Sequence, residues 1–466
     1  MLRRTLLALT LTCTLQAQAG SFDFLPASSG AEKEFKSLMN SGNYRQALVA
    51  WHTAHGNSAF AATANGQATY SFLLFQNGLP FIGVDTLFKQ TQPKSLNSQL
   101  VKVWKTELNA SPLVQKGLVE ATGSWSSIAL SDVNRNARAL WQTATQAPLN
   151  GNLEASLKAL KSLKDSEQNI IGKDLISLTY ARVLFQKGDI DGALEAFNQI
   201  PKSSSIWIES VEERGWAHLR KEDYDKAVGE TVTLLSPALV PLVGPESYFF
   251  ANLTALKICD YPRIFKNSEL FKKRHRQRLA DMQELAKNGS HKNIPALLER
   301  LEQKGVSVEG AGPLVEALPR AALRDTRFTH AIESRRQLLA ETKQINDLSG
   351  TILGGAAELQ RMASNAKLQA DKLKNSSLQR LRTLAQAEVK EYSNILNKLH
   401  IVEASVIERL SADDNLKGQR SKLSQNEKKS ADVLVFPYEG DEVWFDELDN
   451  YKARVKDCPT LKGASL

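Results

Sequence analysis

The sequence predicts an all-α protein that consists of stacked helical hairpins, a pair of long helices and a small C-terminal docking segment. Three observations lead to this prediction. A Gly-x-apolar-x-x-Ala pattern recurs between helical stretches, apolar residues later recur every seven positions, and an aromatic-rich segment lies near the C-terminus. The chain has 466 residues, of which 42% are hydrophobic, so it can bury a sizeable core.

The first stretch, MLRRTLLALTLTCTLQAQAG, has the order of an export signal. Two arginines precede an apolar run, and an Ala-Gln-Ala tripeptide ends at Ala19. We therefore assign residues 1–19 to a signal peptide that is cleaved after Ala19, and expect a periplasmic or secreted protein. Cys13 also allows a lipoprotein signal, but Thr12 precedes it where such signals use Gly, Ala or Ser.

The charge balance favours anionic surfaces and acidic partners. The formal net charge is +8, and a mildly basic exported protein meets lipid headgroups or acidic proteins rather than nucleic acid. The densest basic cluster, KKRHRQR at 272–278, is interpreted as a solvated helix face, because no aromatic residues are interleaved for base stacking. No apolar run of the mature chain approaches the roughly 18 residues that span a bilayer.

A helix-turn-helix unit recurs along the first part of the chain. In GDIDGAL, Ile190 and Ala193 follow Gly188, and in EDYDKAV the residues Tyr224 and Ala227 take the same places. The distance from Ile190 to Tyr224 is 34 residues, a period typical of helical repeats. Other members of the scheme are Gly42, Tyr44, Ala47, Trp51, Gly151, Phe197 and Tyr261, with Gly78 as a further turn.

Each position of the unit has a mechanical role. Glycine reaches the left-handed backbone conformation that closes the first helix, and the next apolar residue covers the turn. The small alanine lets the two helices approach closely, and a large residue four positions later lies on the same helix face. We therefore predict that these residues are packing and turn positions.

On these residues the chain resembles the tetratricopeptide repeat family, over roughly residues 31–265. The resemblance implies a right-handed superhelix with a concave groove for peptides or partner proteins, and no chemistry of its own. Pro80, Gly83 and Thr231 depart from the family pattern, and residues 111–136 fit no unit. We assign residues 20–320 to this repeat solenoid.

A different periodicity follows in residues 325–410. Apolar residues recur every seven positions with small residues between them, which indicates a coiled coil. The register changes at KNSS, residues 374–377, so we predict an antiparallel hairpin that turns there. The alternative is one bent helix that pairs with another chain, and Gly354-Gly355 weakens the first arm.

The remaining chain divides into a linker and a docking segment. Residues 411–431 are polar and aperiodic and are predicted to be a flexible linker. Residues 432–466 begin with an extended apolar run up to Phe436-Pro437. A turn and an amphipathic helix with Trp444, Leu448, Tyr451 and Val455 on one face are predicted to follow, and the whole segment is predicted to dock on another surface. In an oxidising compartment Cys259 and Cys458 are candidates for a disulfide, if the tail folds back on the repeats; two separately buried thiols are the alternative.

Candidates for enzymatic chemistry are weak. His52 and His55 lie three positions apart without a third ligand nearby, which favours ordinary helix residues over a metal site. The carboxylates between Asp441 and Asp449 lack the spacing of a calcium loop. ESYFF at 246–250 superficially resembles the start of a lytic transglycosylase motif, with Glu246 as the acid, but the expected continuation is missing. We expect no catalytic residue, no cofactor and no metal.

Two functions of different class remain. The first is a non-enzymatic scaffold or adaptor that binds a partner protein or peptide in the solenoid groove. The second is a structural component of a cell-envelope assembly, of motility or secretion type, that forms homo-oligomers through the coiled coil. A peptidoglycan-lytic enzyme is the remote alternative.

Overall fold

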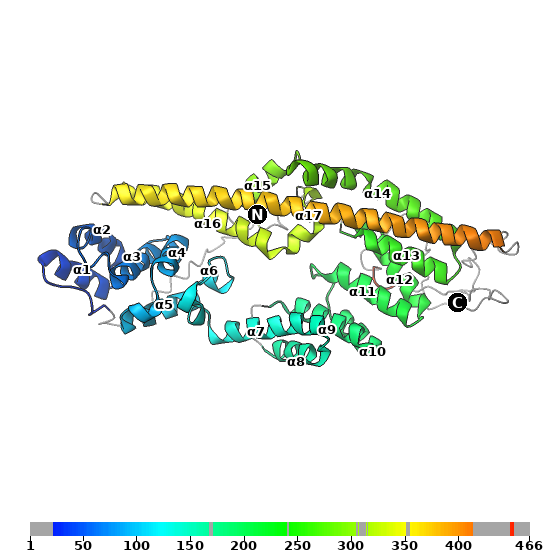
Figure 1. The fold of residues 1–466 in the computed structure, drawn as a ribbon, viewed down its shortest axis with the longest axis horizontal. Coiled ribbons are helices and arrows are strands. Elements are labelled where there is room, and N and C mark those ends of the chain that lie inside the picture. Colours follow the sequence, from blue (N-terminus) through cyan, green and yellow to red (C-terminus); the bar gives the residue numbers. More distant parts are fainter. Residues whose placement is uncertain are drawn as a thin grey trace, which may run out of the picture. The chain divides into compact units, whose positions relative to one another are not determined.

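The computed structural model describes residues 22–166, 171–239, 242–303, 306, 314, 316–350, 355–412 and 448–451. In this part of the chain α-helices α1 to α17 and short 3-10 turns form, and no β-strand is found (Figure 1). The all-α prediction is therefore confirmed.

The chain forms two compact units, and each one combines helical hairpins with a part of the long helices. The first unit comprises Met1–Ser131 and His330–Ser376, and the second comprises Asp132–Thr329 and Ser377–Leu466. These units do not follow the order of the predicted domains, because α17 contributes to both of them.

The first unit contains α1 (Gly30–Asn40), α2 (Tyr44–Ala54), α3 (Ala64–Gln76), α4 (Pro80–Gln90), α5 (Ser98–Ala110), α6 (Pro112–Gln115), most of α16 (Thr326–Ser349) and the start of α17 (Ala356–Ala412). The second unit contains α7 (Asp132–Gln146), α8 (Leu153–Lys164), α9 (Lys173–Lys187), α10 (Ile190–Asn198), α11 (Trp207–Arg220), α12 (Tyr224–Leu235), α13 (Pro245–Lys257), α14 (Tyr261–Asn288), α15 (Ile294–Glu302) and the rest of α17. From α7 to α14, each helix packs against the next one along the chain.

The hairpin turns share one backbone conformation. In the pairs α1–α2, α3–α4, α7–α8, α9–α10, α11–α12 and α13–α14, one residue between the helices has a positive φ. These residues are Gly42 (75°), Gly78 (85°), Gly151 (76°), Gly188 (91°), Glu222 (63°) and Cys259 (58°). Glycine adopts this conformation at no steric cost, whereas Glu222 and Cys259 lose roughly 1–2 kcal/mol there.

The next residue often caps the second helix of the pair. Side chains at this position accept a hydrogen bond from a backbone N–H three residues later, which satisfies one of the unpaired donors of the first turn. The residues that do so are Asn152, Asp189, Asp223 and Asp260.

Small residues lie where the two helices of a hairpin approach each other. Ala47, Ala193 and Ala227 are fully buried. In the α3–α4 pair this place is taken by Gly83, and a Cβ built there would lie 2.7 Å from the carbonyl oxygen of Ser71. The backbones approach too closely for any side chain, which explains the departure from alanine at this position.

The long helices complete the core of the first unit. Leu338 and Ile345 of α16 and Leu359 of α17 are fully buried in the same cluster as the side chains of α1 to α5. The guanidinium of Arg335 donates to the carbonyl oxygen of Ala370 at 2.8 Å, and α16 lies beside the start of α17 (Figure 1). The predicted heptad positions thus pack on the hairpins as well as on each other.

A carboxylate from α16 caps the N-terminus of α4. Glu341, 1% exposed, accepts hydrogen bonds from the backbone N–H groups of Phe81 at 2.7 Å and Ile82 at 2.9 Å. Pro80 is the first residue of α4 and has no N–H, so these two donors are the unpaired ones that the carboxylate satisfies. The contact joins residues that are 260 positions apart.

The predicted turn at 374–377 is wrong. Helix α17 runs unbroken for 57 residues, about 86 Å at 1.5 Å per residue, and Ser377 is buried in it. Asn and Ser cost only a few tenths of a kcal/mol each in a helix interior, which is too little to end a long helix here. Helix α16 ends at Ser349, and α17 begins at Ala356.

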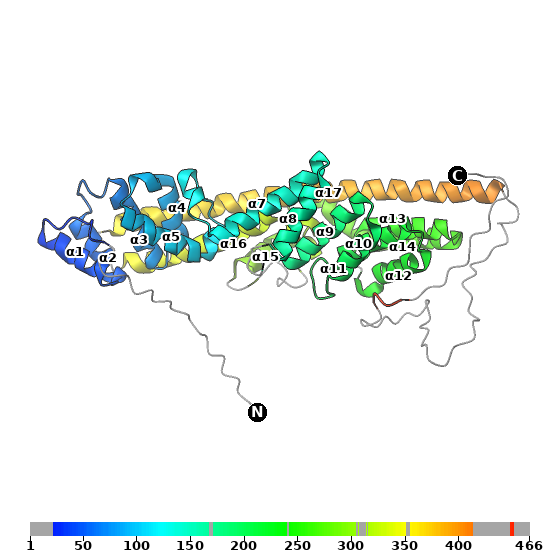
Figure 2. The same cartoon turned by 90° about the horizontal axis from the view of Figure 1, so that it is seen from below.

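In the second unit the later part of α17 runs along α13 and α14 (Figure 2). Tyr392 and Leu399 pack against Tyr248 and Phe271. The hydroxyl of Tyr392 shares a hydrogen bond of 3.0 Å with Nδ1 of His275. The buried ring pairs and this bond fix the helix on the hairpins.

The basic cluster at 272–278 is therefore only partly a solvated face. Lys272, Lys273 and Arg276 are exposed, as expected. His275 is buried, however, and Arg278 donates to the buried Glu388 at 2.7 Å. Burial, together with the positive charges of Arg320, Arg278 and Arg274, lowers the pKa of His275 to about 4.

Candidate functional site

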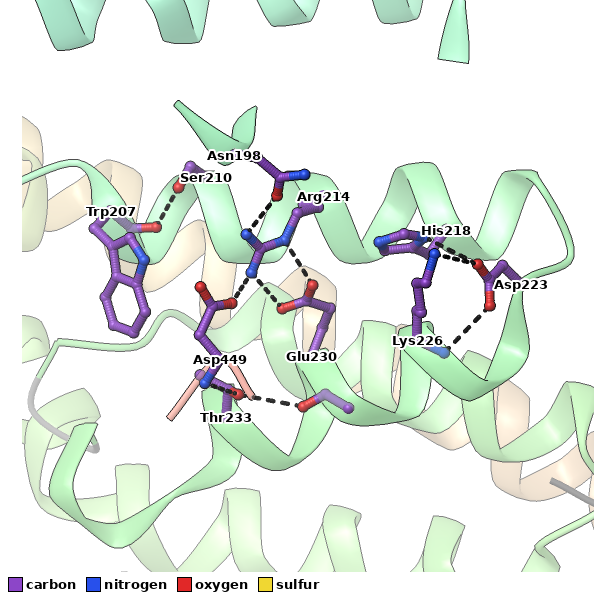
Figure 3. Close-up of polar contacts among 11 residues, drawn as sticks. Asn198, Trp207, Ser210, Arg214, His218, Asp223, Lys226, Glu230, Thr233 and Asp449 are labelled. Atoms are coloured by element: carbon purple, nitrogen blue, oxygen red, sulfur yellow. Dashed lines mark hydrogen bonds and ion pairs between the residues drawn. The ribbon is translucent and has the colours of Figure 1, made fainter. Parts of the chain in front are cut away.

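A short C-terminal stretch, Leu448–Tyr451, lies against α11 and α12, and we call its binding surface the docking site (Figure 3). The side chain of Leu448 is fully buried and joins the apolar core formed by α9 to α13, where Tyr451 also packs. The stretch therefore contributes side chains to the core although it is remote in sequence.

The main chain of this stretch is held at three points. Nζ of Lys202 donates to the carbonyl oxygen of Leu448 at 2.5 Å, and the N–H of Asp449 donates to Oγ1 of Thr233 at 3.0 Å. The carbonyl oxygen of Tyr451 lies over Gly229, where a Cβ would be only 2.7 Å from it. These contacts hold the main chain of the stretch rather than its side chains.

A buried arginine connects the two helices to the docked stretch. Arg214 of α11 donates from Nε and a terminal nitrogen to the carboxylate of Glu230 on α12, at 2.6 and 2.9 Å, and to the side-chain oxygen of Asn198 at 2.9 Å. It also donates to a carboxylate oxygen of Asp449 (Figure 3). Arg214 and Glu230 are each only 7% exposed.

The charges of this cluster stabilise one another. Burial raises the pKa of Glu230, and the adjacent Arg214 opposes that rise. The planar guanidinium suits a bidentate pair with one carboxylate and still leaves donors for other acceptors. Asp449 supplies such an acceptor, so an acidic residue of the docked stretch completes the cluster.

The docked aspartate also has an unusual backbone. The φ angle of Asp449 is 76°, in the left-handed region that Asp, Asn and Gly tolerate best. The prediction of a helix with Leu448 and Tyr451 on one face is therefore wrong for 448–451, which form a turn. The site therefore accommodates a leucine, then an acidic residue in a turn conformation, then an aromatic residue two positions on.

A second polar group lies further along α11 and has a structural role. Nδ1 of His218 is 3.6 Å from a carboxylate oxygen of Asp223, which also pairs with Lys226 at 3.3 Å. Burial lowers the pKa of His218 to about 4, so the ring is neutral near pH 7. This group surrounds the α11–α12 turn.

The predicted packing residues and the docking residues meet in one core. Ala193, Phe197 and Ala227 belong to the apolar cluster that receives Leu448. The polar residues that contact the stretch were not predicted. Gly229 was the available signal, because a glycine inside a helical segment indicates a close backbone approach.

The two histidines considered as metal ligands have different neighbours. Nδ1 of His52 is 3.9 Å from a carboxylate oxygen of Glu358, and Nδ1 of His55 is 4.0 Å from one of Glu32. The rings of His55 and Phe35 are 5.0 Å apart, edge to face. Within the described ranges, no group of three or more His, Cys, Asp or Glu residues is placed to hold a metal ion.

Cys259 and Glu246 are the remaining candidates. Cys259 is disulfide-bonded, whereas Cys458 lies outside the described residues, so their pairing stays a prediction. Glu246 is exposed in the first turn of α13. Nearby, Ser247 donates a hydrogen bond to Glu212, whose pKa burial raises to about 7. Except for Asp449, the predicted acidic cluster from Asp441 onward also lies outside the described residues.

Comparison with known proteins gives no family assignment: no protein-family model matches the chain, and no curated protein matches it either. Among the described helices, none combines the length and the apolar character required to cross a membrane. The docking site is therefore the feature of this chain that bears most directly on its function.

Proposed function

We propose that this chain is a non-enzymatic, exported scaffold or adaptor that binds a partner polypeptide on its helical hairpins. The observation that carries the proposal is the docking site, where α11 and α12 hold a polypeptide stretch through main-chain contacts, a buried leucine and an arginine–carboxylate pair. These groups bind and orient a chain, which is the task of an interaction protein.

The architecture that we propose is a tetratricopeptide-like right-handed solenoid. The recurring left-handed turn residues and the packing of each helix from α7 to α14 on the next one support it. In such arrays every unit contacts mainly its neighbours, so the stack offers a long continuous surface. The periplasm or the extracellular space is the proposed location, with Gly20 as the first residue of the mature protein.

A second candidate is a structural component of a cell-envelope assembly. The observation that favours it is the apolar exposure of α17, on which Ile401 and Ile407 are 66% and 56% exposed. In this proposal α17 forms a coiled coil with a second copy of the chain.

One crosslinking experiment in the native envelope distinguishes the two candidates. A photo-reactive amino acid is placed at Leu175, which is exposed on α9, and in a separate variant at Ile401 of α17. Adducts with another protein at position 175 support the adaptor. Adducts between two copies at position 401, with a dimer in light scattering, support the structural role. The absence of adducts at both positions contradicts both proposals.

The remote enzymatic alternative has its own test. Muramidase activity of the mature protein on purified cell wall, abolished by Glu246→Gln, would establish it. We expect no such activity, because the Glu246 side chain is exposed in the first turn of α13.

A further inference from the structure

The docking site selects a particular kind of peptide. Leu448 fills an apolar position of the core, and the carboxylate of Asp449 pairs with Arg214. Asparagine shares the turn preference of aspartate, but it lacks the charge that pairs with a buried guanidinium. The pattern that fits is leucine, aspartate, any residue and an aromatic residue.

Gly229 restricts the site to a closely approaching backbone. A methyl group there would lie 2.7 Å from the carbonyl oxygen of Tyr451, and a backbone atom cannot move aside as the end of a side chain can. Alanine is the better helix former, yet α12 has glycine at this point. The close approach accounts for the glycine.

The occupant is tethered to the protein that it occupies. Residues 413–447 connect the end of α17 to Leu448, and the ion pair joins positions 235 apart in sequence. The docked stretch and its site therefore belong to one chain, and an attached segment occupies its site at an effective concentration that the connection sets. A partner with the same chemistry must compete against it.

We propose that the docking site recognises a Leu-Asp-x-aromatic segment of a partner protein, and that residues 448–451 are its tethered competitor. This inference rests on the proposed adaptor function and deepens it. It gives the chain two states, one in which its own tail fills the site and one in which the partner does.

The test uses the full mature chain and a fluorescein-labelled peptide with the sequence FDELDNYKAR, residues 445–454. Fluorescence anisotropy, in a buffer with a reductant that opens the disulfide of Cys259, compares the wild type with a tail variant that carries Leu448→Ala and Asp449→Ala. We expect the tail variant to bind the peptide at least tenfold more tightly, because its own tail competes less. Adding Gly229→Ala to the tail variant should weaken binding at least tenfold.

Two controls show that the effect belongs to the site. Arg220→Ala removes an exposed arginine of α11, the helix that also carries Arg214. The partners of Arg220 are the carbonyl oxygen and ring of Phe185, so this variant should leave peptide binding unchanged. A peptide with Ala in place of Asp449 should bind at least tenfold more weakly. Circular dichroism of every variant establishes that the helices are retained.

Each other outcome overturns a stated part of the proposal. Equal affinity of the wild type and the tail variant means that the tail does not compete. Absence of binding to the tail variant, or binding that Gly229→Ala leaves unchanged, means that the site does not recognise the segment. A dimer that forms with rising concentration and is lost in the tail variant means that a second copy is the occupant. None of these results affects the crosslinking at Leu175, which decides the adaptor function separately.

Discussion

The sharpest prediction concerns the buried arginine of the docking site. Arg214→Met keeps most of the aliphatic length of the side chain but removes every donor of the guanidinium. Glu230 then loses two hydrogen bonds, at 2.6 and 2.9 Å, while it remains only 7% exposed. An uncompensated buried charge typically costs about 3–5 kcal/mol, and we expect the second unit to lose that much free energy of unfolding.

A companion variant separates stability from docking. Adding Glu230→Leu removes the unpaired carboxylate, and replacing both members of a buried pair by apolar residues is often close to neutral. We expect the double variant to recover at least half of the lost stability. It should not regain the docked tail, because Asp449 still has no guanidinium to pair with.

Hydrogen exchange measures the stability of the hairpin and the docking of the tail in one experiment. Amides of α11 and α12 report the stability of the hairpin, and the fragment that contains Leu448 reports docking. In Arg214→Met the loss should also shrink as the pH falls, since burial raises the pKa of Glu230 and so favours the neutral form of the carboxyl. A loss of less than about 1 kcal/mol in free energy of unfolding for Arg214→Met contradicts this prediction. So does a double variant whose Leu448 fragment is as well protected from exchange as in the wild type.

Three further predictions concern packing and pH. Glu341→Ala leaves the N–H groups of Phe81 and Ile82 unpaired and should lower the stability of the first unit by about 2–4 kcal/mol. Glu341→Gln keeps one acceptor and should lower it by about half as much. Urea denaturation measures both losses. Gly83→Ala should cost about 1–2 kcal/mol because its methyl meets a backbone oxygen, while Gly30→Ala, which meets nothing within 4 Å, should be neutral or stabilising. The pKa of His275, about 4 in the folded chain, lies below its unfolded value of about 6.5. The stability that the folded chain gains from keeping His275 neutral is therefore complete above about pH 6.5 and is lost as the pH falls toward the folded pKa of about 4. His275→Gln, which can keep a hydrogen bond with Tyr392, should remove up to about 3 kcal/mol of that dependence in denaturation at pH 7 and pH 4.5.

The features of the fold that the sequence predicts correctly depend on the conformational preferences of nearby residues. Gly42, Gly151 and Gly188 were expected at turns that need a left-handed backbone, and each has a positive φ. Ala193 and Ala227 were expected at close helix contacts, and both are fully buried. These positions depend on residues within one hairpin, so a sequence pattern is enough to find them.

The error at 374–377 has the opposite origin. Asparagine and serines weaken a helix only slightly, and whether they end it depends on what packs around them. Lys374, Asn375 and Ser376 are exposed and Ser377 is buried, and α17 continues through all four of them. The heptad pattern identified the buried face correctly at Leu338, Ile345 and Leu359, but not where the helix breaks.

The helical class, the positions of the hairpin turns and the small residues between paired helices follow from the conformational preferences of a few neighbouring residues, so they can be predicted from sequence. Which remote groups meet depends on the folded chain. The carboxylate of Glu341 caps a helix 260 positions away, and Asp449 completes a buried charge cluster 235 positions away. A charged residue shows no periodicity that reveals its partner, since its burial is tolerated only after the fold has brought the opposite charge or the unpaired N–H groups to it.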